Sequence, residues 1–224
     1  MRIPLAPEGY PFIAASLTPA ALFIVLAVAY GGWLLWAVAT ISLLLAFCMT
    51  GFFRDPERNG PRGPELVIAP ADGRVIDISR TPEPEYRKGQ ALRISIFLSL
   101  FNVHVNRYPV SGLVEYRSHD SGRFEPAWRN SASHENERAS SGIDSHGHKI
   151  LVVQVAGLVA RRIVTYAQVG DKVDQGDRLG LIRFGSRLDV YLPEGATPAV
   201  QMGQRARGGE TLIARLPIST SEAL

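Results

Sequence analysis

Residues 179–192 read LGLIRFGSRLDVYL and contain two short apolar runs, at 179–184 and 188–192. Leu, Ile and Val dominate both runs, and a Gly-Ser pair, the only one in the chain, lies between them. Short apolar runs of this kind, bounded by turn residues, are typical of β-strands in a packed core. The stretch therefore predicts two strands that meet at Gly185 and Ser186.

The same pattern recurs through most of the remaining chain. Further runs rich in Val and Ile occupy residues 66–69, 74–79, 92–99, 112–116, 150–155, 160–167 and 211–216, with turn sequences such as Ala71-Asp72-Gly73 around them. Strands at this spacing predict a mainly β domain, a compact barrel or sandwich of hybrid-motif type. The polar segment 118–149 departs from the pattern, and we expect a long functional loop there with a short helix within 125–139.

The N-terminal part of the chain is of a different kind. Residues 1–50 contain only two formally charged side chains, Arg2 and Glu8, so the rest of the chain carries the whole net charge of +3. Two uncharged apolar runs, at 12–29 and 33–50, are each about as long as a membrane-spanning helix requires. We therefore predict an α-helical membrane hairpin at 1–53 and a separate folded domain at 54–224.

Two features of the sequence bear on how this hairpin is placed in the membrane. Arg54 and Arg58 follow the second run whereas the connecting turn is uncharged, which favours a cytoplasmic domain by the positive-inside rule. Pro19 and the shortness of both runs leave open a hairpin that enters one leaflet without crossing.

Cys48 is the single cysteine, which excludes an intramolecular disulfide. No glycine-rich phosphate loop or basic block indicates nucleotide or nucleic acid binding.

The Gly185-Ser186 pair is either an ordinary turn or a site of self-cleavage. A serine hydroxyl can attack the carbonyl of the preceding residue and form an ester, and glycine suits that preceding position because it has no side chain and tolerates a twisted backbone. Such a reaction needs a base for the hydroxyl proton and a carboxylate to hold the base. His104 and Asp72 are candidates for these roles, although a buried strand histidine and an Asp-Gly turn would also explain them.

Six segments, in order, resemble the short bacterial and archaeal branch of the phosphatidylserine decarboxylase proenzyme family. They cover nearly all of residues 52–193 and comprise FFRDPER at 52–58, APADGRV at 69–75, ISIFLSLFNVHVNR at 94–107, NERA at 136–139, VAGLVARRI at 155–163 and RFGSRLDV at 183–190. Any one of these segments is a weak signal, but their joint occurrence in this order is specific.

The resemblance implies a function and a set of roles, and it identifies residues 54–224 as the decarboxylase domain. Ser186 would become a covalent pyruvoyl cofactor after cleavage from Gly185, with Asp72 and His104 activating the serine. The products, residues 1–185 and 186–224, would stay associated. The mature enzyme would convert phosphatidylserine to phosphatidylethanolamine and CO2 in phospholipid biosynthesis, at the bacterial inner membrane with its catalytic domain in the cytoplasm. A homo-oligomeric assembly and the acyl-chain preference stay open.

One position departs from the family pattern. Longer members of the family place a second histidine three residues before the one that matches His104, and here that position is Phe101. We therefore expect His104 to return the proton during decarboxylation, as a base that has taken a proton can do. For the lipid head group we expect a contact with Arg138, and for the lipid's apolar part contacts with Phe124 and Trp128.

Two alternatives come from other motifs. Residues 169–180, VGDKVDQGDRLG, resemble lipoyl- and biotinyl-type domains, so a membrane-tethered carrier or adaptor with a modified Lys172 is one rival. The pair His146 and His148, with Asp144 and His119 nearby in the sequence, is the other, because zinc hydrolases need three such protein ligands. Since this pair lies in a polar segment, we expect no metal centre.

Overall fold

A computed structural model describes residues 4–121, 136–157, 163–183 and 186–217, and divides the chain into two compact units, Met1–Glu57 and Arg58–Leu224. The first unit is a pair of helices, α1 (Tyr10–Tyr30) and α2 (Trp33–Phe52), preceded by the short 3-10 helix η1 (Pro7–Gly9). Gly31 and Gly32 join the helices with φ angles of 70° and 91°, which side chains rarely adopt. The predicted helical hairpin is therefore confirmed.

Small residues line the contact between the two helices. Ala20 and Ala27 of α1 and Ala39 and Ala46 of α2 are buried, whereas most of the large apolar side chains face outward. Both helices are long and apolar enough to cross a membrane, since about 20 residues at 1.5 Å each span about 30 Å. A small-residue contact with an apolar exterior is the arrangement that membrane helices use to pack in lipid.

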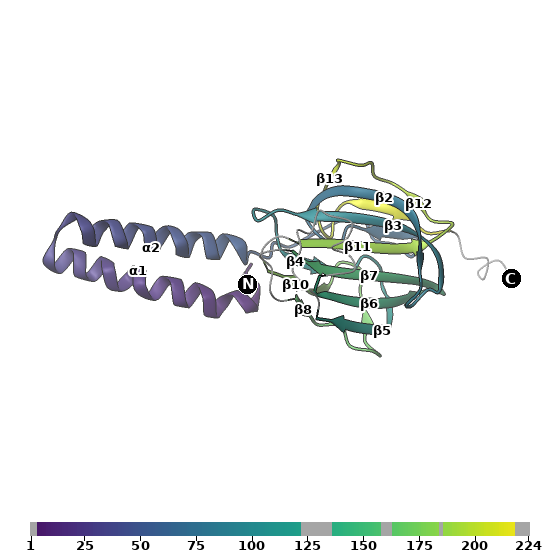
Figure 1. The fold of residues 1–224 in the computed structure, drawn as a ribbon, viewed down its shortest axis with the longest axis horizontal. Helices are drawn as coiled ribbons and strands as arrows, with labels where there is room; N and C mark the ends of the chain where they lie inside the picture. Colours follow the sequence, from purple (N-terminus) through teal and green to yellow (C-terminus); the bar gives the residue numbers. More distant parts are fainter. Residues whose placement is uncertain (1–3, 122–135, 158–162, 184–185, 218–224) are drawn as a thin grey trace. The chain divides into compact units, whose positions relative to one another are not determined.

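The second unit is built from strands in three sheets (Figure 1). The largest is a curled antiparallel sheet of eight strands in the order β13-β2-β3-β11-β7-β6-β5-β9, and two three-stranded sheets have the orders β4-β10-β8 and β1-β14-β12. The mainly β prediction is thus confirmed. The strand bounds are β1 (Leu66–Ile68), β2 (Gly73–Glu83), β3 (Gly89–Leu98), β4 (Val105–Arg107), β5 (Gly112–Asp120), β6 (Arg138–Ser145), β7 (His148–Ala156), β8 (Ile163–Thr165), β9 (Lys172–Val173), β10 (Arg178–Ile182), β11 (Ser186–Pro193), β12 (Thr197–Pro198), β13 (Arg205–Ala206) and β14 (Leu212–Arg215).

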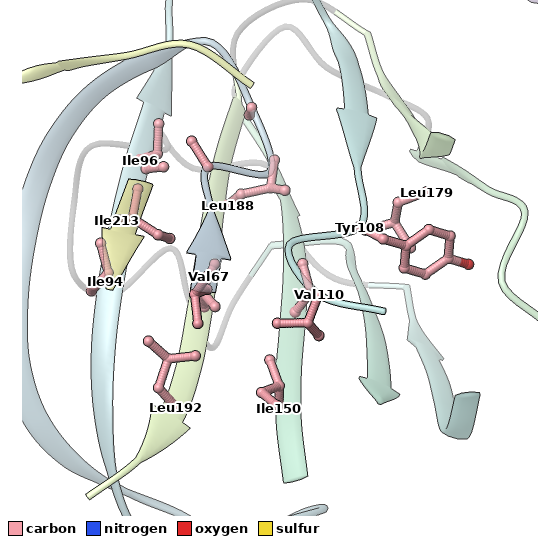
Figure 2. Packing of buried hydrophobic residues seen from close by; sticks show 14 of the residues in the cluster. Val67, Ile94, Ile96, Tyr108, Val110, Ile150, Leu179, Leu188, Leu192 and Ile213 are labelled. Carbon is pink, nitrogen blue, oxygen red and sulfur yellow. The ribbon is translucent and has the colours of Figure 1, made fainter. Parts of the chain in front are cut away.

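The main hydrophobic core joins all three sheets (Figure 2). Ile94 and Leu188 of the large sheet pack in one cluster with Leu179 of β10 and with Val67 and Ile213 of the third sheet. Side chains alternate along a strand, so residues 186, 188, 190 and 192 of β11 lie on this inner face. A smaller cluster on the outer face contains Tyr86, Leu151, Val153 and Val155.

The expectation of a long loop over 118–149 is wrong for the part that the structure describes. Arg138–Ser145 forms strand β6 between β5 and β7, and residues 122–135 lie outside the described residues together with most of the expected helix. Ser140, Ser141 and Ser145 are buried in this strand although they are polar. Its stability comes from backbone pairing on both sides, which an apolar-polar pattern does not report.

Candidate active site

Ser186 is the first residue of β11, at the centre of the large sheet. It pairs with Leu98, the last residue of β3, on one side and with Ala156, the last residue of β7, on the other. Its side chain is on the face that carries Leu188, and the residue is fully buried. Gly185 lies outside the described residues. The predicted cleavage position therefore borders the start of a central strand, where a hydroxyl is shielded from water.

His104 comes directly before the short strand β4, and it too is fully buried. Val105 pairs with Leu181 of β10, so in this antiparallel register His104 comes alongside Ile182. Only residues 183–185 separate Ile182 from Ser186 in the chain. His104 therefore lies alongside the residue four positions before the start of β11 in the chain.

Two amide side chains tie β4 to the inner face of the large sheet. Asn106 donates a hydrogen bond to the His104 carbonyl (3.3 Å) and accepts one from Gln154 (2.8 Å). Gln154 is opposite Leu188 in the pairing of β7 with β11, two residues beyond Ser186. All these side chains are buried, where unpaired polar groups would be costly. His104 and Ser186 are thus brought to the same buried end of the sheet.

Asp72 lies at the same end of the sheet, immediately before β2. The β2–β3 pairing sets Arg74 opposite Phe97, and a side chain at Gly73 would overlap the Phe97 carbonyl oxygen. The starts of β2 and β11 and the end of β3 are therefore neighbours, and glycine permits the close approach. Asp72, His104 and Ser186 all belong to this end of the domain, and their joint action stays a prediction.

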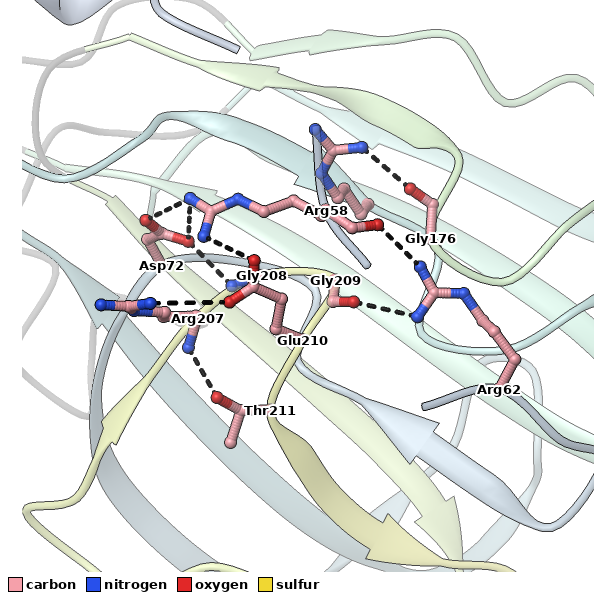
Figure 3. Close-up of polar contacts among 10 residues, drawn as sticks. Arg58, Arg62, Asp72, Gly176, Arg207, Gly208, Gly209, Glu210 and Thr211 are labelled. Carbon is pink, nitrogen blue, oxygen red and sulfur yellow. Dashed lines mark hydrogen bonds and ion pairs between the residues drawn. The ribbon is translucent and has the colours of Figure 1, made fainter. Parts of the chain in front are cut away.

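The hydrogen bonds of the Asp72 carboxylate run to a polar network that the sequence did not indicate (Figure 3). Arg58 Nη2 donates to Oδ1 and Oδ2 at 3.1 and 2.9 Å, and the Gly208 amide donates to Oδ1 at 2.8 Å. Arg58 also lies 3.5 Å from Glu210. Within the described part of the chain these are the partners of Asp72, and its contact with His104 stays a prediction.

The other face of β11 carries a buried charge pair. Arg187 and Asp189 are both almost fully buried, with Nε to Oδ1 and Nη2 to Oδ2 distances of 2.9 Å. Burial, followed by the charge of Asp189, raises the pKa of the neighbouring Tyr191 hydroxyl. A buried ion pair is tolerated only when its geometry is good, and removing one member is strongly destabilising. The pair therefore fixes β11 from the side opposite Ser186.

Arg138 is the first residue of β6 rather than part of a loop. Its guanidinium lies 2.8 Å from Asp120 and 2.9 Å from Glu85. Burial lowers the pKa of Arg138, but the hydrogen bond to Asp120 and the charge of Glu85 raise it overall. Two carboxylates thus already hold this arginine, and its predicted head-group contact stays a prediction. Phe124 and Trp128 lie outside the described residues.

The residues of the zinc alternative are not brought together. His146 and Gly147 form the tight turn between β6 and β7, with φ angles of 52° and 80°, and the Nε2 atom of His148 lies 3.1 Å from the Pro217 carbonyl oxygen. His119 lies opposite Ala139, at the other end of β6, and is 3.3 Å from Glu137. Six residues of strand separate these ends, about 20 Å. Across the described ranges, no group of three or more His, Cys, Asp or Glu side chains could hold a metal ion.

The carrier alternative needs a lysine at the tip of a hairpin. Lys172 is exposed, but it forms strand β9 with Val173 and pairs with Leu113. The turn that precedes it contains Gly170, whose φ of 97° explains the Gly-Asp sequence without a modification site. The structure therefore gives the resemblance to lipoyl-type sequences a local explanation in turn geometry.

Comparisons of the sequence with known proteins identify one family. The sequence model of the family described as phosphatidylserine decarboxylase matches residues 45–214. Proteins named phosphatidylserine decarboxylase proenzyme are similar over nearly the whole chain. One from Symbiobacterium thermophilum is 47% identical over 221 residues, covering 97% of this chain and 98% of that protein. One from Mycobacteroides abscessus is 49% identical over 218 residues, covering 96% of this chain and 88% of the relative. The chain therefore belongs to the phosphatidylserine decarboxylase family of carboxy-lyases.

Proposed function

We propose that this chain decarboxylates phosphatidylserine to phosphatidylethanolamine, and that it first cuts itself between Gly185 and Ser186. The names of the relatives give phosphatidylserine as the substrate and describe the uncut chain as a proenzyme. The observation that carries the proposal for this chain is that the serine of its Gly-Ser pair starts a central strand, buried at the end of the domain that also holds His104. An ordinary surface turn would not need its serine to be buried at the end of the domain that also buries a histidine.

In the proposed maturation, the chain's own side chains perform each step. His104 takes the proton of the Ser186 hydroxyl, and the hydroxyl oxygen attacks the Gly185 carbonyl carbon. An ester bond from this carbon to the serine oxygen forms while the peptide bond to the serine nitrogen breaks. Elimination across the Cα–Cβ bond of residue 186 then releases Gly185 as the carboxylate end of residues 1–185. Addition of water to the resulting dehydroalanine expels ammonia and leaves a pyruvoyl end on residues 186–224. Burial favours this route because water is kept from competing attack on the ester.

The strand pairing supports a cut that leaves the two products together. A break before Ser186 removes no partner from β11, because Ser186 itself still pairs with Leu98 and Ala156. The register of β11 continues to Pro193 against β3 and to Tyr191 against β7. The small product would thus stay as a central strand between two strands of the large one. A pyruvoyl group at residue 186 would thus be held in place by the strands on both sides of β11.

When present, that group supplies a ketone that takes up the substrate's amine and accepts electrons as CO2 leaves. The chain's part is to exclude water and to supply the proton that replaces the carboxylate. His104 is our candidate donor, since it is buried alongside Ile182, four residues before Ser186, and its role as a base ends with cleavage. Phe101, in contrast, is 89% exposed on the turn after β3. We propose that the domain works on the cytoplasmic side of the inner membrane, with α1 and α2 as the anchor.

The direct test of the cofactor uses reagents that attack a ketone. Borohydride or hydroxylamine should inactivate the mature enzyme and should add mass to residues 186–224 only. The uncut Ser186→Ala protein should gain no mass under the same treatment. Full activity after treatment would contradict the proposal. An untreated, uncut chain that already carries a modification on Lys172 would also contradict it and would favour the carrier alternative.

Asp72 and Arg58 should affect self-cleavage together. Asp72→Asn removes the charge that Arg58 and Gly208 hold in place, and Arg58→Gln releases the same carboxylate from its main partner. Each should slow the appearance of the two products by about 10²-fold or more, within the range for a positioned acid–base group. Arg215→Gln is the matched control, because Arg215 is paired with Glu65 and not with Asp72 or Arg58. Equal rates for all three variants would remove Asp72 from the mechanism.

A further inference from the structure

The turn that follows β3 holds two large apolar side chains out of the domain. Asn102 Oδ1 accepts hydrogen bonds from the Ser99 amide (2.8 Å) and the Ser99 hydroxyl (2.7 Å), and the Asn102 amide donates to the Ser99 carbonyl (3.0 Å). Between them, Leu100 is 50% exposed and Phe101 is 89% exposed. The turn is thus closed by its own hydrogen bonds while its tip is apolar. Such a tip suits an apolar environment outside the protein.

A basic cleft lies beside this turn. Its volume is about 710 Å³, and Ser99 and Asn102 of the turn line it together with Asp72, Arg74, Arg205 and Arg207. Arg205 pairs with Arg74, which pairs with Phe97, so the first two arginines lie side by side on neighbouring strands. The three arginine residues are exposed. This cleft is therefore an open, cationic surface rather than an enclosed pocket.

The positive charge of this cleft is only partly compensated. Arg58 already pairs with Asp72, the carboxylate in the wall. Arg207 lies 3.8 Å from Glu210, while Arg74 donates to the Gly203 carbonyl at 2.9 Å, a neutral partner. Guanidinium groups of neighbouring arginines bind phosphate in a planar, bidentate manner. The wall is consequently complementary to a phosphodiester.

We infer that the tip of the turn, Leu100 and Phe101, and the three arginines Arg74, Arg205 and Arg207 form a docking surface for a bilayer that contains anionic phospholipid. The apolar tip enters the interface while the arginines contact the phosphates, a division of roles typical of interfacial proteins. Met202, 67% exposed next to Gly203, adds a second apolar contact at the edge of the cleft. The inference rests on the membrane attachment proposed above.

This docking surface would also set the head group at the end of the sheet where the reacting residue lies. Phe97, in the wall of the cleft, pairs with Arg187 of β11, and Ser186 is the next residue toward the end of the sheet. Neighbouring strands are about 4.8 Å apart. Arg74 on β2 and Arg205 on β13 lie two and three strands from β11, about 10 and 14 Å, and they share the outer face of the sheet with Phe97, opposite the Ser186 side chain. A phospholipid held by these arginines would thus have its head group on the outer face at the end of the sheet where β11 begins, with its acyl chains beside the apolar tip.

The test uses the full chain in nanodiscs, with a polarity-sensitive fluorophore on a single cysteine. Cys48→Ser removes the native thiol, Leu100→Cys places the label at the tip, and Val169→Cys labels a different exposed apolar position as the site control. Nanodiscs contain phosphatidylcholine with or without phosphatidylglycerol, which is not the proposed substrate. We expect a blue shift and quenching by brominated acyl chains only for the label at 100, and only with phosphatidylglycerol.

The contributions of the arginine charges and of the apolar tip to membrane docking can then be measured separately. Each arginine near an anionic surface strengthens binding about fivefold, so Arg74→Gln with Arg205→Gln should lower the ratio of docked to undocked protein about thirtyfold. Phe101→Ser should also reduce quenching. The matched control Arg80→Gln should not, because Arg80 lies farther along β2 and is paired with Glu194. Inorganic phosphate added to phosphatidylcholine nanodiscs should cause no blue shift, which separates lipid docking from simple anion binding.

Equal quenching of the label at position 100 in nanodiscs with and without phosphatidylglycerol would overturn the docking surface. An equal loss of quenching in Arg80→Gln and in the double variant Arg74→Gln with Arg205→Gln would do so too. The unlabelled chain is assayed in parallel with phosphatidylserine nanodiscs. Decarboxylation without quenching at position 100 would contradict the docking surface alone. Quenching without decarboxylation would contradict the proposed function and leave the docking surface in place.

Discussion

Replacing Ser186 with alanine is expected to leave the chain as one uncut polypeptide without decarboxylase activity. The change removes the hydroxyl oxygen that we propose attacks the preceding carbonyl, and without this oxygen no pyruvoyl group should form at residue 186. Because the residue is fully buried among apolar neighbours, alanine is accommodated there without loss of the strand. Denaturing gel electrophoresis of the purified protein measures the outcome directly.

Ser140→Ala is the matched control for this substitution. Ser140 is also a buried serine in the large sheet, on β6, but it pairs with Val153 and lies away from the start of β11. This variant should be cut as fully as the parent chain. A Ser186→Ala protein that still yields products ending at residue 185 would show that another nucleophile makes the cut.

Replacing His104 is expected to have the second largest effect. Loss of a positioned general base slows a reaction by about 10²- to 10⁴-fold, so His104→Ala should accumulate uncut chain while the parent is fully processed. Asn106 holds the His104 backbone rather than its ring, so the strand should survive the change. The measurement is the time course of product formation after synthesis of the chain.

His146→Asn provides the control for this histidine. His146 occupies a turn position with a φ of 52°, which asparagine tolerates well, and it lies at the opposite end of β6 from Arg138. Its rate of cleavage should match that of the parent. Added imidazole should partly restore cleavage in His104→Ala by entering the space left by the ring. Unchanged cleavage in His104→Ala would assign the base to another group.

The sequence predicted the β architecture well where strands have one apolar face. The run at 92–99 corresponds to β3, Gly89–Leu98, and the runs around the Gly-Ser pair correspond to β10 and β11. The prediction missed β6, because Arg138 and the buried serines of this strand give it a polar composition. The energy of such a strand lies in backbone pairing to β5 and β7, which side-chain periodicity does not encode.

The sequence predicts the reacting residues of the candidate site but not the residues that hold the Asp72 carboxylate in place. Ser186, His104 and Asp72 stand in segments that resemble the family. Gly208 lies in none of those segments, and Arg58, at the end of one, was assigned no role in the site. Both hold Asp72 across the fold, from 14 and 136 positions away in the chain. Contacts of this separation come from the packing of the three sheets. Only the FFRDPER segment, which ends in Arg58, offered a signal.

Intact mass measurement of the purified full-length protein tests the central claim most directly. The proposed function predicts two chains that meet between residues 185 and 186, with the small chain lighter by one ammonia than a peptide starting in serine. Because β11 pairs on both sides, the two chains should copurify and separate only on denaturation. A single chain of full mass in a protein that is active on phosphatidylserine would contradict the account.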